Sequence, residues 1–232
     1  MKIRIAIDGP AGTGKSTVAK KIAEKLGIDY LDTGAMYRAI AKIFLDRKLN
    51  PDEISEKTLE ELFKEIKFDL KCEKLYLNGK PLGDEIRNPE VGKVVSKVAS
   101  LKIVREKLTD IQKRLSENRS IVVEGRDIGT VVLPNAELKI FLTASATERA
   151  KRRFKELISK GLKISFQEVL DEILQRDKLD SSREVAPLKP AEDSIIINTD
   201  NLTIEQVVEK IFEILNSKFG RLVSINETNN CQ

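Results

Sequence analysis

Near its beginning the chain reads Gly9-Pro-Ala-Gly-Thr-Gly-Lys-Ser16, which matches the pattern G-x-x-x-x-G-K-[ST]. The segment 2–8 before it alternates basic and apolar residues and then becomes apolar, as a buried parallel strand does. The segment after it has apolar residues at helical spacing and reaches Gly27, a typical residue at a helix end. Strand, glycine-rich turn and helix are the context that the pattern requires, so this stretch predicts a phosphate-binding loop in an α/β fold.

The chemistry of such a loop is specific. Glycines let the backbone curl so that N–H groups face phosphate oxygens, and the following helix points its positive end at the same anion. Lys15 is placed to reach the β- and γ-phosphates, and the Ser16 hydroxyl is placed to bind Mg²⁺. A plain structural turn would not need the lysine and the hydroxyl, so we expect a nucleoside triphosphate bound with Mg²⁺.

The rest of the chain alternates strands with helices, apart from one interruption. The expected strands of the main sheet are 2–8, 28–31, 121–123, 138–142 and 194–199. The helices expected between and after these strands are 15–26, 35–47, 147–160, 165–175 and 203–218. Strands separated by helices predict a doubly wound, five-stranded parallel sheet with right-handed crossovers.

The interruption reads as an inserted α+β subdomain. It contains a short helix pattern at 58–65, short strands at 67–70 and 74–77, and a hairpin turn at Asn78-Gly79. After it, apolar residues at helical spacing predict one long helix over 89–115. The expected divisions are a core domain of 1–45 and 116–218, an acceptor-binding insertion of 46–115, a helical lid and following loop of 149–183, and a flexible tail of 219–232.

Composition excludes several function classes. The chain has 232 residues, 41 Lys and Arg against 37 Asp and Glu, and no histidine. It therefore has no histidine base, no Ser-His triad and no histidine-ligated metal. Cys72 and Cys231 are too few and too far apart for a disulfide scaffold or a cysteine-based zinc site. No apolar run approaches ~20 residues, and the N-terminus does not read as a signal peptide, so we expect a cytoplasmic protein that binds no membrane.

Three further stretches favour a small-molecule kinase. The first two, Tyr30–Arg38 and Glu124–Thr130, follow predicted strands, where open α/β sheets bind ligands. The third is a basic helix around Glu148–Arg153 with Arg176, Asp180 and Arg183 downstream, which next to a phosphate loop suggests a lid. Alone, each stretch could be an ordinary loop or a solvated basic face. A GTPase would need an N-K-x-D element, which the sequence lacks.

These motifs resemble those of the bacterial cytidylate kinases, which belong to the P-loop nucleoside monophosphate kinases. The matching stretches are Gly9–Thr17, Leu31-Asp-Thr-Gly-Ala-Met-Tyr-Arg38, Glu124-Gly-Arg-Asp-Ile-Gly-Thr-Val-Val132 and Asp180-Ser-Ser-Arg-Glu-Val-Ala-Pro-Leu188. The resemblance runs from about residue 3 to 215 and includes the insertion. Thr13 stands where Ala or Ser is more usual, and the tail after Lys218 is outside the pattern.

The resemblance implies a monomeric enzyme of pyrimidine nucleotide metabolism that transfers a phosphoryl group from ATP to CMP or dCMP, with Mg²⁺. The residues implied for ATP are Gly9, Pro10, Ala11, Gly12, Thr13, Gly14, Lys15, Ser16, Thr17 and Arg152, with Ser16 also for Mg²⁺. Those implied for CMP are Thr33, Arg38, Ser96, Arg105, Arg126, Asp127, Arg176, Asp180 and Arg183. Those implied for catalysis are Lys15, Arg126, Arg149, Arg153 and Arg183. In this scheme Ser96, Arg105 and Asp127 read the cytosine, and Arg149, Arg152 and Arg153 lie over the ATP phosphates.

The implied reaction is chemically consistent with the composition. A nucleoside monophosphate is mostly dianionic at neutral pH, because its second pKa is ~6, so it needs no general base. Other acceptors, such as UMP, AMP or shikimate, remain open. So does a nucleotide-binding regulator or nucleic-acid-associated ATPase, although aromatic residues make up only 5% of the chain and no nucleic-acid partner is expected. Glu124 has two open readings, a water-mediated Mg²⁺ contact or a pair with an arginine.

Overall fold

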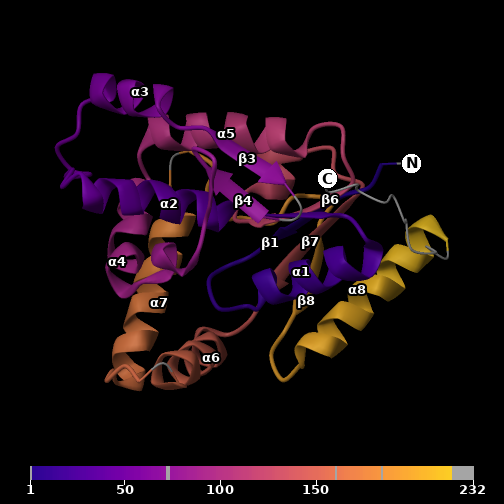
Figure 1. Cartoon of the computed structure of the whole chain (residues 1–232). Coiled ribbons are helices and arrows are strands. Elements are labelled where there is room, and N and C mark those ends of the chain that lie inside the picture. Colours follow the sequence, from indigo (N-terminus) through magenta and orange to yellow (C-terminus); the bar gives the residue numbers. More distant parts are fainter. Residues whose placement is uncertain (1, 72–73, 160, 184, 221–232) are drawn as a thin grey trace.

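A five-stranded parallel sheet forms the centre of the molecule (Figure 1). The computed structural model describes residues 2–71, 74–159, 161–183 and 185–220. The strand order is β2-β6-β1-β7-β8, and every pairing in this sheet is parallel. The strands are β1 Arg4–Asp8, β2 Asp29–Asp32, β6 Ile121–Gly125, β7 Leu138–Thr143 and β8 Ile195–Asn198. The predicted fold class is confirmed.

The register of the central strands brings the functional segments to one edge. Arg4 pairs with Ile121 and Asp8 with Gly125, so β1 and β6 end side by side. Asp32 of β2 lies opposite Glu124 of β6. Because parallel strands all end at the same edge, the segments that follow β1, β2 and β6 lie close together there.

Helices cover both faces of the sheet. On one face lie α1 Lys15–Leu26 and α8 Ile204–Phe219, which share one apolar cluster with the inner strands. On the other face lie α2 Thr33–Asp46 and α5 Lys102–Ser116. Local residues determine where these helices begin and end. Gly27, in the left-handed conformation, is the C-cap of α1, and a capping box begins α8.

The insertion packs onto the second face and shares its core. Its elements are α3 Glu56–Lys64, β3 Phe68–Lys71, β4 Lys74–Leu77, β5 Lys80–Pro81, the 3₁₀ turn η1 Asp84–Arg87 and α4 Pro89–Val98. The three strands form a small antiparallel sheet joined at the predicted Asn78-Gly79 turn. Leu59, Phe68 and Val91 belong to the same apolar cluster as α2 and β6. The proposed boundary at 46–115 stays a prediction.

The prediction of a single long helix over 89–115 is wrong. The structure has two helices there, α4 and α5, separated by Ala99–Leu101. Leu101 is extended, with φ −65° and ψ 121°, and the Ser100 hydroxyl donates to the Lys97 carbonyl. The carbonyl of Ala99, released by the break, accepts a hydrogen bond of 3.2 Å from Nη1 of Arg105. The apolar spacing continues through the break, so periodicity gave no sign of it.

The lid region is a helical hairpin that extends away from the sheet (Figure 1). It consists of α6 Ala146–Ser159 and α7 Phe166–Ser181. Ala150, Leu157, Val169 and Ile173 form a small apolar cluster of their own. The prediction ended the second helix near 175, which is wrong, because α7 continues for six more residues and carries Arg176, Asp177 and Asp180.

Three local details differ from the expectations or lie beyond them. The strand over 195–198 is an edge strand rather than a core strand, and Ile196 is 59% exposed. A single π-helical turn, η2 Ile128–Val132, was not predicted. Cys72, Cys231 and most of the predicted tail lie outside the described residues. In the described part of the chain, no helix combines the length and apolar character needed to cross a membrane.

Candidate active site at the carboxyl edge of the parallel sheet

The loop between β1 and α1 has the backbone shape of an anion cradle. Gly12 and Gly14 are left-handed, with φ 80° and 88°, and a Cβ at Gly9 would lie 2.0 Å from the Leu142 carbonyl oxygen. No side chain caps the start of α1, and its first turn holds no acidic residue. The first amide groups of α1 are therefore left for an anion, which fits a phosphate at this position.

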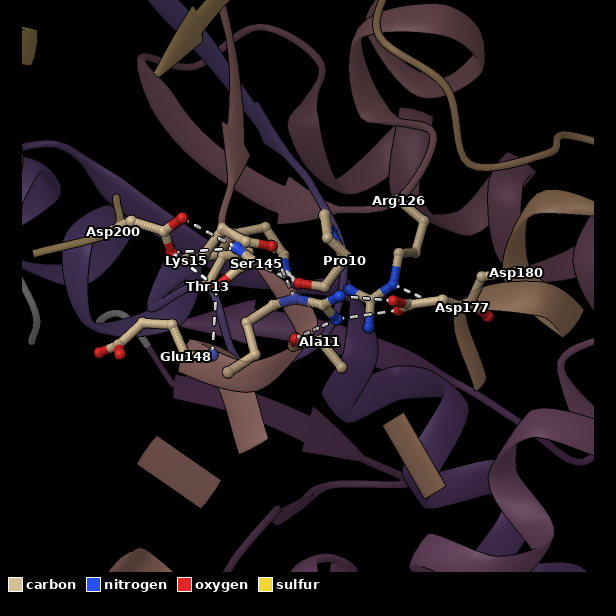
Figure 2. A network of polar contacts seen from close by, with 12 residues as sticks. Pro10, Ala11, Thr13, Lys15, Arg126, Ser145, Glu148, Asp177, Asp180 and Asp200 are labelled. Atoms are coloured by element: carbon tan, nitrogen blue, oxygen red, sulfur yellow. Dashed lines mark hydrogen bonds and ion pairs between the residues drawn. The ribbon is translucent and has the colours of Figure 1, made fainter. Parts of the chain in front are cut away.

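Lys15 folds back onto this loop. Its Nζ donates to the Pro10 carbonyl oxygen at 2.6 Å, within the polar network of Figure 2. Burial lowers the pKa of Lys15, and the positive charge of Arg126 lowers it further. Thr13, the departure from the usual loop sequence, donates its hydroxyl to the same carbonyl at 3.1 Å. A bound anion would stabilise the charge on Lys15 that burial opposes.

A cavity of about 590 Å³ lies in front of the loop and brings most of the predicted residues together. Of the predicted residues, its lining includes Ala11, Gly12, Gly14, Lys15, Ser16, Thr17, Thr33, Arg38, Ser96, Arg105, Arg126, Asp127, Arg152, Arg153, Arg176, Asp180 and Arg183. Gly9, Pro10, Thr13 and Arg149 lie outside that lining. The first three belong to the loop itself, and Arg149 is buried behind it.

Arginines are the commonest charged residues in the lining of the cavity. Asp180 accepts a hydrogen bond of 2.8 Å from Nε of Arg126 and also pairs with Arg183. Burial lowers the pKa of Arg176 to about 10, and repulsion by Arg126 adds to the effect. Within the described structure, four lining arginines have a buried Nε that finds no hydrogen-bond partner: Arg38, Arg105, Arg176 and Arg183. Such donors are what an anionic ligand would satisfy.

Arg105 and Asp127, for which the family resemblance implies contact with the base, form a buried ion pair. Nη2 of Arg105 is 2.6 Å from Oδ2 of Asp127, and these side chains are 3% and 6% exposed. Ser96 of α4 lines the same cavity. The Arg105 guanidinium lies 5.5 Å from the centre of the Tyr37 ring. Two fixed, opposite charges next to a cavity can distinguish donor from acceptor groups on a ligand.

Two carboxylates organise the edge near the loop. Asp32 caps α2 by accepting from the Ala35 amide at 2.8 Å, and it pairs with Arg38 and Arg87 at 2.7 and 3.2 Å. The Glu124 carboxylate accepts from the Tyr30 hydroxyl at 3.0 Å. Burial raises the pKa of Glu124, and Asp32 raises it further. The negative charge of Glu124 also acts on Arg126, whose pKa it raises, so both interpretations of Glu124 stay predictions.

The lid arginines connect α6 to the rest of the site in different ways. Arg153 pairs with Glu156 on its own helix at 2.7 Å. Arg152 donates to the Thr199 carbonyl at 2.6 Å and still lines the cavity. Arg149 reaches the phosphate loop from behind and donates to the Ala11 carbonyl at 3.2 Å. The prediction that all three lie over ATP phosphates stays a prediction.

Comparison with known proteins agrees with this geometry. A model of the family described as "Cytidylate kinase" matches residues 5–217. This chain belongs to the cytidylate kinase family. A cytidylate kinase of Thermosipho melanesiensis is 55% identical over 94% of this chain and 99% of its own length. One from Thermotoga maritima is 48% identical over 95% of this chain and 100% of its own. The predicted family and enzyme class, a nucleoside monophosphate kinase, are confirmed.

Solved structures give only a distant likeness. A shikimate kinase from Bacteroides thetaiotaomicron is 17% identical, with a TM-score of 0.46 over 92% of this chain and 98% of that one. A likeness at this level carries no argument about the substrate.

Sequence reasoning assigned no role to three carboxylates that organise the surroundings of the cavity. Asp8 is buried at the end of β1 and accepts from the amides of Ile128 and Gly129 at 2.8 and 2.7 Å, which holds the turn after Arg126. Burial raises the pKa of Asp8 to about 6. Asp32 stood inside a quoted motif without an assigned role, and Asp177 had no sequence signal. Asp8 and Asp177 bind groups that are far away in the sequence, whereas Asp32 binds Ala35 and Arg38 of its own motif.

Proposed function

We propose that this cytidylate kinase transfers the γ-phosphoryl group of ATP to CMP or dCMP, giving CDP or dCDP and ADP. The observation that carries the proposal is one cavity whose lining combines a phosphate loop with arginines that have unpartnered donors among the described residues. Two polyanions could lie there facing each other. The lowered pKa values of Lys15 and Arg176 support this, because bound anions would stabilise both charges.

The acceptor needs no base from the protein. Its phosphate is mostly dianionic above its second pKa of ~6 and can attack the γ-phosphorus directly. The absence of histidine from the chain is consistent with this chemistry. The task left to the protein is to bring two anions in line and to neutralise the charge on the transferred group.

The cations of the cavity divide between the two substrates. Lys15, Arg152 and Arg153 are on the side of the loop and α6, where ATP phosphates would bind. Arg38, Arg126 and Arg183 would hold the phosphate of the acceptor through the planar donors of the guanidinium. Asp180, held by two arginines, would contact the ribose together with Arg176.

Mg²⁺ would arrive with ATP. The residues fit such an ion, since Ser16 lies in the first turn of α1 and a hydrogen bond with Ser16 lowers the pKa of the nearby Glu124 carboxylate. No cluster of three or more metal-binding side chains occurs among the described residues. That fits Mg²⁺, which keeps several waters and binds through few protein groups and substrate phosphates. Bound there, the ion would neutralise charge on the triphosphate.

The base preference would rest on the buried Arg105–Asp127 pair. The exocyclic amine of cytosine can donate a hydrogen bond to the Asp127 carboxylate, whereas uracil has a carbonyl at that position. We expect Asp127→Asn to reduce the ratio of kcat/KM for CMP over UMP by at least about tenfold. Steady-state kinetics with both monophosphates measures this ratio. An unchanged ratio would remove Asp127 from base recognition.

The acceptor itself is tested by a panel. ADP release is coupled to a spectrophotometric assay with CMP, dCMP, UMP, AMP and shikimate as acceptors. We expect CMP and dCMP to give the highest kcat/KM. Equal rates with AMP and CMP would contradict the assignment of CMP as the acceptor. Turnover stimulated by single-stranded nucleic acid would favour the ATPase alternative.

A monomer working in the cytoplasm remains our prediction. Its support is the similarity to the cytidylate kinases, which favours a monomer. Light scattering of the purified protein with and without CMP measures the mass. A stable dimer would contradict the monomer.

A further inference from the structure

The guanidinium of Arg149 is held on three sides. Its Nη1 lies 3.2 Å from the Ala11 carbonyl oxygen and its Nε 3.0 Å from the Ala144 carbonyl oxygen. Both terminal nitrogens bind the Asp177 carboxylate, at 3.0 and 2.6 Å. The Arg149 side chain is only 5% exposed. This arginine is therefore committed to protein groups.

The contact with Ala11 joins the lid to the phosphate loop. Figure 2 shows Ala11 and Asp177 in one polar network with Lys15 nearby. The backbone contact is equally close, because a Cβ added to Gly12 would lie 3.0 Å from the Cβ of Arg149. The start of α6 thus packs directly on the loop that would hold the ATP phosphates.

Helix α7 reaches both sides of the site. Arg176 and Asp180, four residues apart, line the cavity where the acceptor would bind. Asp177 follows Arg176 by one position and is turned by ~100° about the helix axis. Its carboxylate points to Arg149 instead. One rigid helix therefore touches the acceptor position and, through Arg149, the phosphate loop.

We propose that Asp177 is a positioning residue that couples acceptor binding to the ATP-binding loop through Arg149. The proposal rests on the proposed function, in which Arg176 and Asp180 contact the acceptor. Without the carboxylate, the mostly buried Arg149 charge loses a bidentate partner and its guanidinium is free to leave Ala11. An acceptor that fixes α7 would thereby fix the loop for ATP.

Coupling of this kind is reciprocal. If CMP improves the affinity for ATP by some factor, ATP improves the affinity for CMP by the same factor. A plain structural ion pair inside the lid would change stability but would leave that factor alone. The coupling factor is therefore the readout that separates the two roles.

The experiment compares the wild type with Asp177→Asn, Asp177→Glu and Glu172→Gln. Glu172→Gln removes the same charge from an exposed position of the same helix. Calorimetry gives the Kd of CMP with and without adenylyl-imidodiphosphate, and kinetics gives KM for ATP. We expect Asp177→Asn to bind CMP alone normally, to lose the coupling, and to raise KM for ATP about tenfold, within the usual 5–150-fold range of coupling. Asp177→Glu should lie between, and Glu172→Gln should match the wild type.

A double-mutant cycle with Arg149→Ala identifies the partner. We expect Asp177→Asn to add little in the Arg149→Ala background, because both changes break the same connection. Additive effects, or wild-type coupling in Asp177→Asn, would overturn the proposal. Should Asp177→Asn fail to fold, Asp177→Glu decides, since wild-type KM for ATP in that variant would overturn it and a raised one would support it. Failure of the proposed function shows separately, as absence of CMP phosphorylation by the wild type.

Discussion

At the scale of single residues, Lys15 shows how a charge can be kept for a ligand. Burial opposes its positive charge, and its Nζ rests on the Pro10 carbonyl. We expect Lys15→Ala to lower kcat by at least about 10²-fold, as loss of a group that neutralises transferred charge does. The coupled assay with CMP measures this.

The same substitution should leave the fold intact. We expect the thermal midpoint to move by no more than about 4 °C, which corresponds to ~1 kcal/mol in a chain of this size. Lys20→Ala, an exposed lysine on the same helix, serves as the control and should keep wild-type activity. A fully active Lys15→Ala protein would contradict the loop assignment.

Asp8 predicts a pH dependence of stability. Its pKa rises from 3.8 to about 6 on folding, with burial as the main cause, Asp127 also raising it and Lys15 lowering it. The folded state therefore binds this proton more tightly than the unfolded state between pH 3.8 and 6. The contribution of Asp8 to the free energy of unfolding falls as pH rises through that window and is constant above it.

Urea unfolding of the wild type and Asp8→Asn at several pH values tests this. The wild-type free energy of unfolding minus that of the variant should fall by on the order of 2–3 kcal/mol between about pH 4 and pH 6. The difference isolates Asp8 from other titrating groups. A difference that does not change with pH would contradict the raised pKa.

The residues of the site could be predicted where their chemistry is local in the sequence. The phosphate loop is one continuous stretch, so its role follows from residues 9–16. Asp8 could not be found in this way, because the amide of Ile128 that it binds is 120 residues away. Asp177 reaches Arg149 across 28 residues and from a part of α7 that periodicity did not extend to. Contacts made only by the fold leave no local pattern.

At the scale of elements, two helix caps allow the stability of the lid to be compared with the stability of the large apolar cluster. Ser165 opens α7 with a capping box, and α7 packs in the small lid cluster. Ser55 opens α3, whose Leu59 and Leu62 belong to the large cluster. Loss of either cap costs about 1 kcal/mol, but the cost falls on different parts of the molecule.

We expect Ser165→Ala to raise KM for both substrates by up to about fivefold with little change in the free energy of unfolding. Ser55→Ala, its matched control, should lower that free energy by about 1 kcal/mol and leave KM unchanged. Urea unfolding and steady-state kinetics of both variants measure these effects. Identical behaviour of the two variants would show that the lid does not open independently of the core.

Elements were predicted well where periodicity and caps agree. Helix α1 ends at Gly27 and the insertion turns at Asn78-Gly79, as the sequence indicated. The break between α4 and α5 was missed because the apolar spacing runs through it, and what marks it is a hydrogen bond from Arg105. Tertiary contacts of this kind override local periodicity.

At the scale of the whole molecule, the excess charge is in the cavity. The cavity lining has nine Lys and Arg and five Asp and Glu, an excess of four positive charges. The whole chain has 41 against 37, the same excess. The remainder of the chain is therefore balanced, and the field that attracts anions is focused on the site.

We expect kcat/KM for CMP to fall several-fold between about 0.05 and about 0.5 M salt, because screening shortens the reach of that field. Stopped-flow measurement of CMP association should show the change in the association rate. Single-stranded DNA should bind weakly and should not stimulate turnover. A salt-independent association rate would contradict focusing by the cavity.

The sheet order has a consequence for how the chain is made. Strand β1 is the centre of the sheet, yet its first partner residue, Ile121, comes 117 residues after Arg4. At ~5–20 residues per second, a ribosome makes β1 about 6–23 s before β6 exists to pair with it. The insertion is completed in that interval, and α4 can then pack against α2, while the cluster they share still lacks the residues of β6. The segment that carries the phosphate loop is thus synthesised well before both strands that pair with β1.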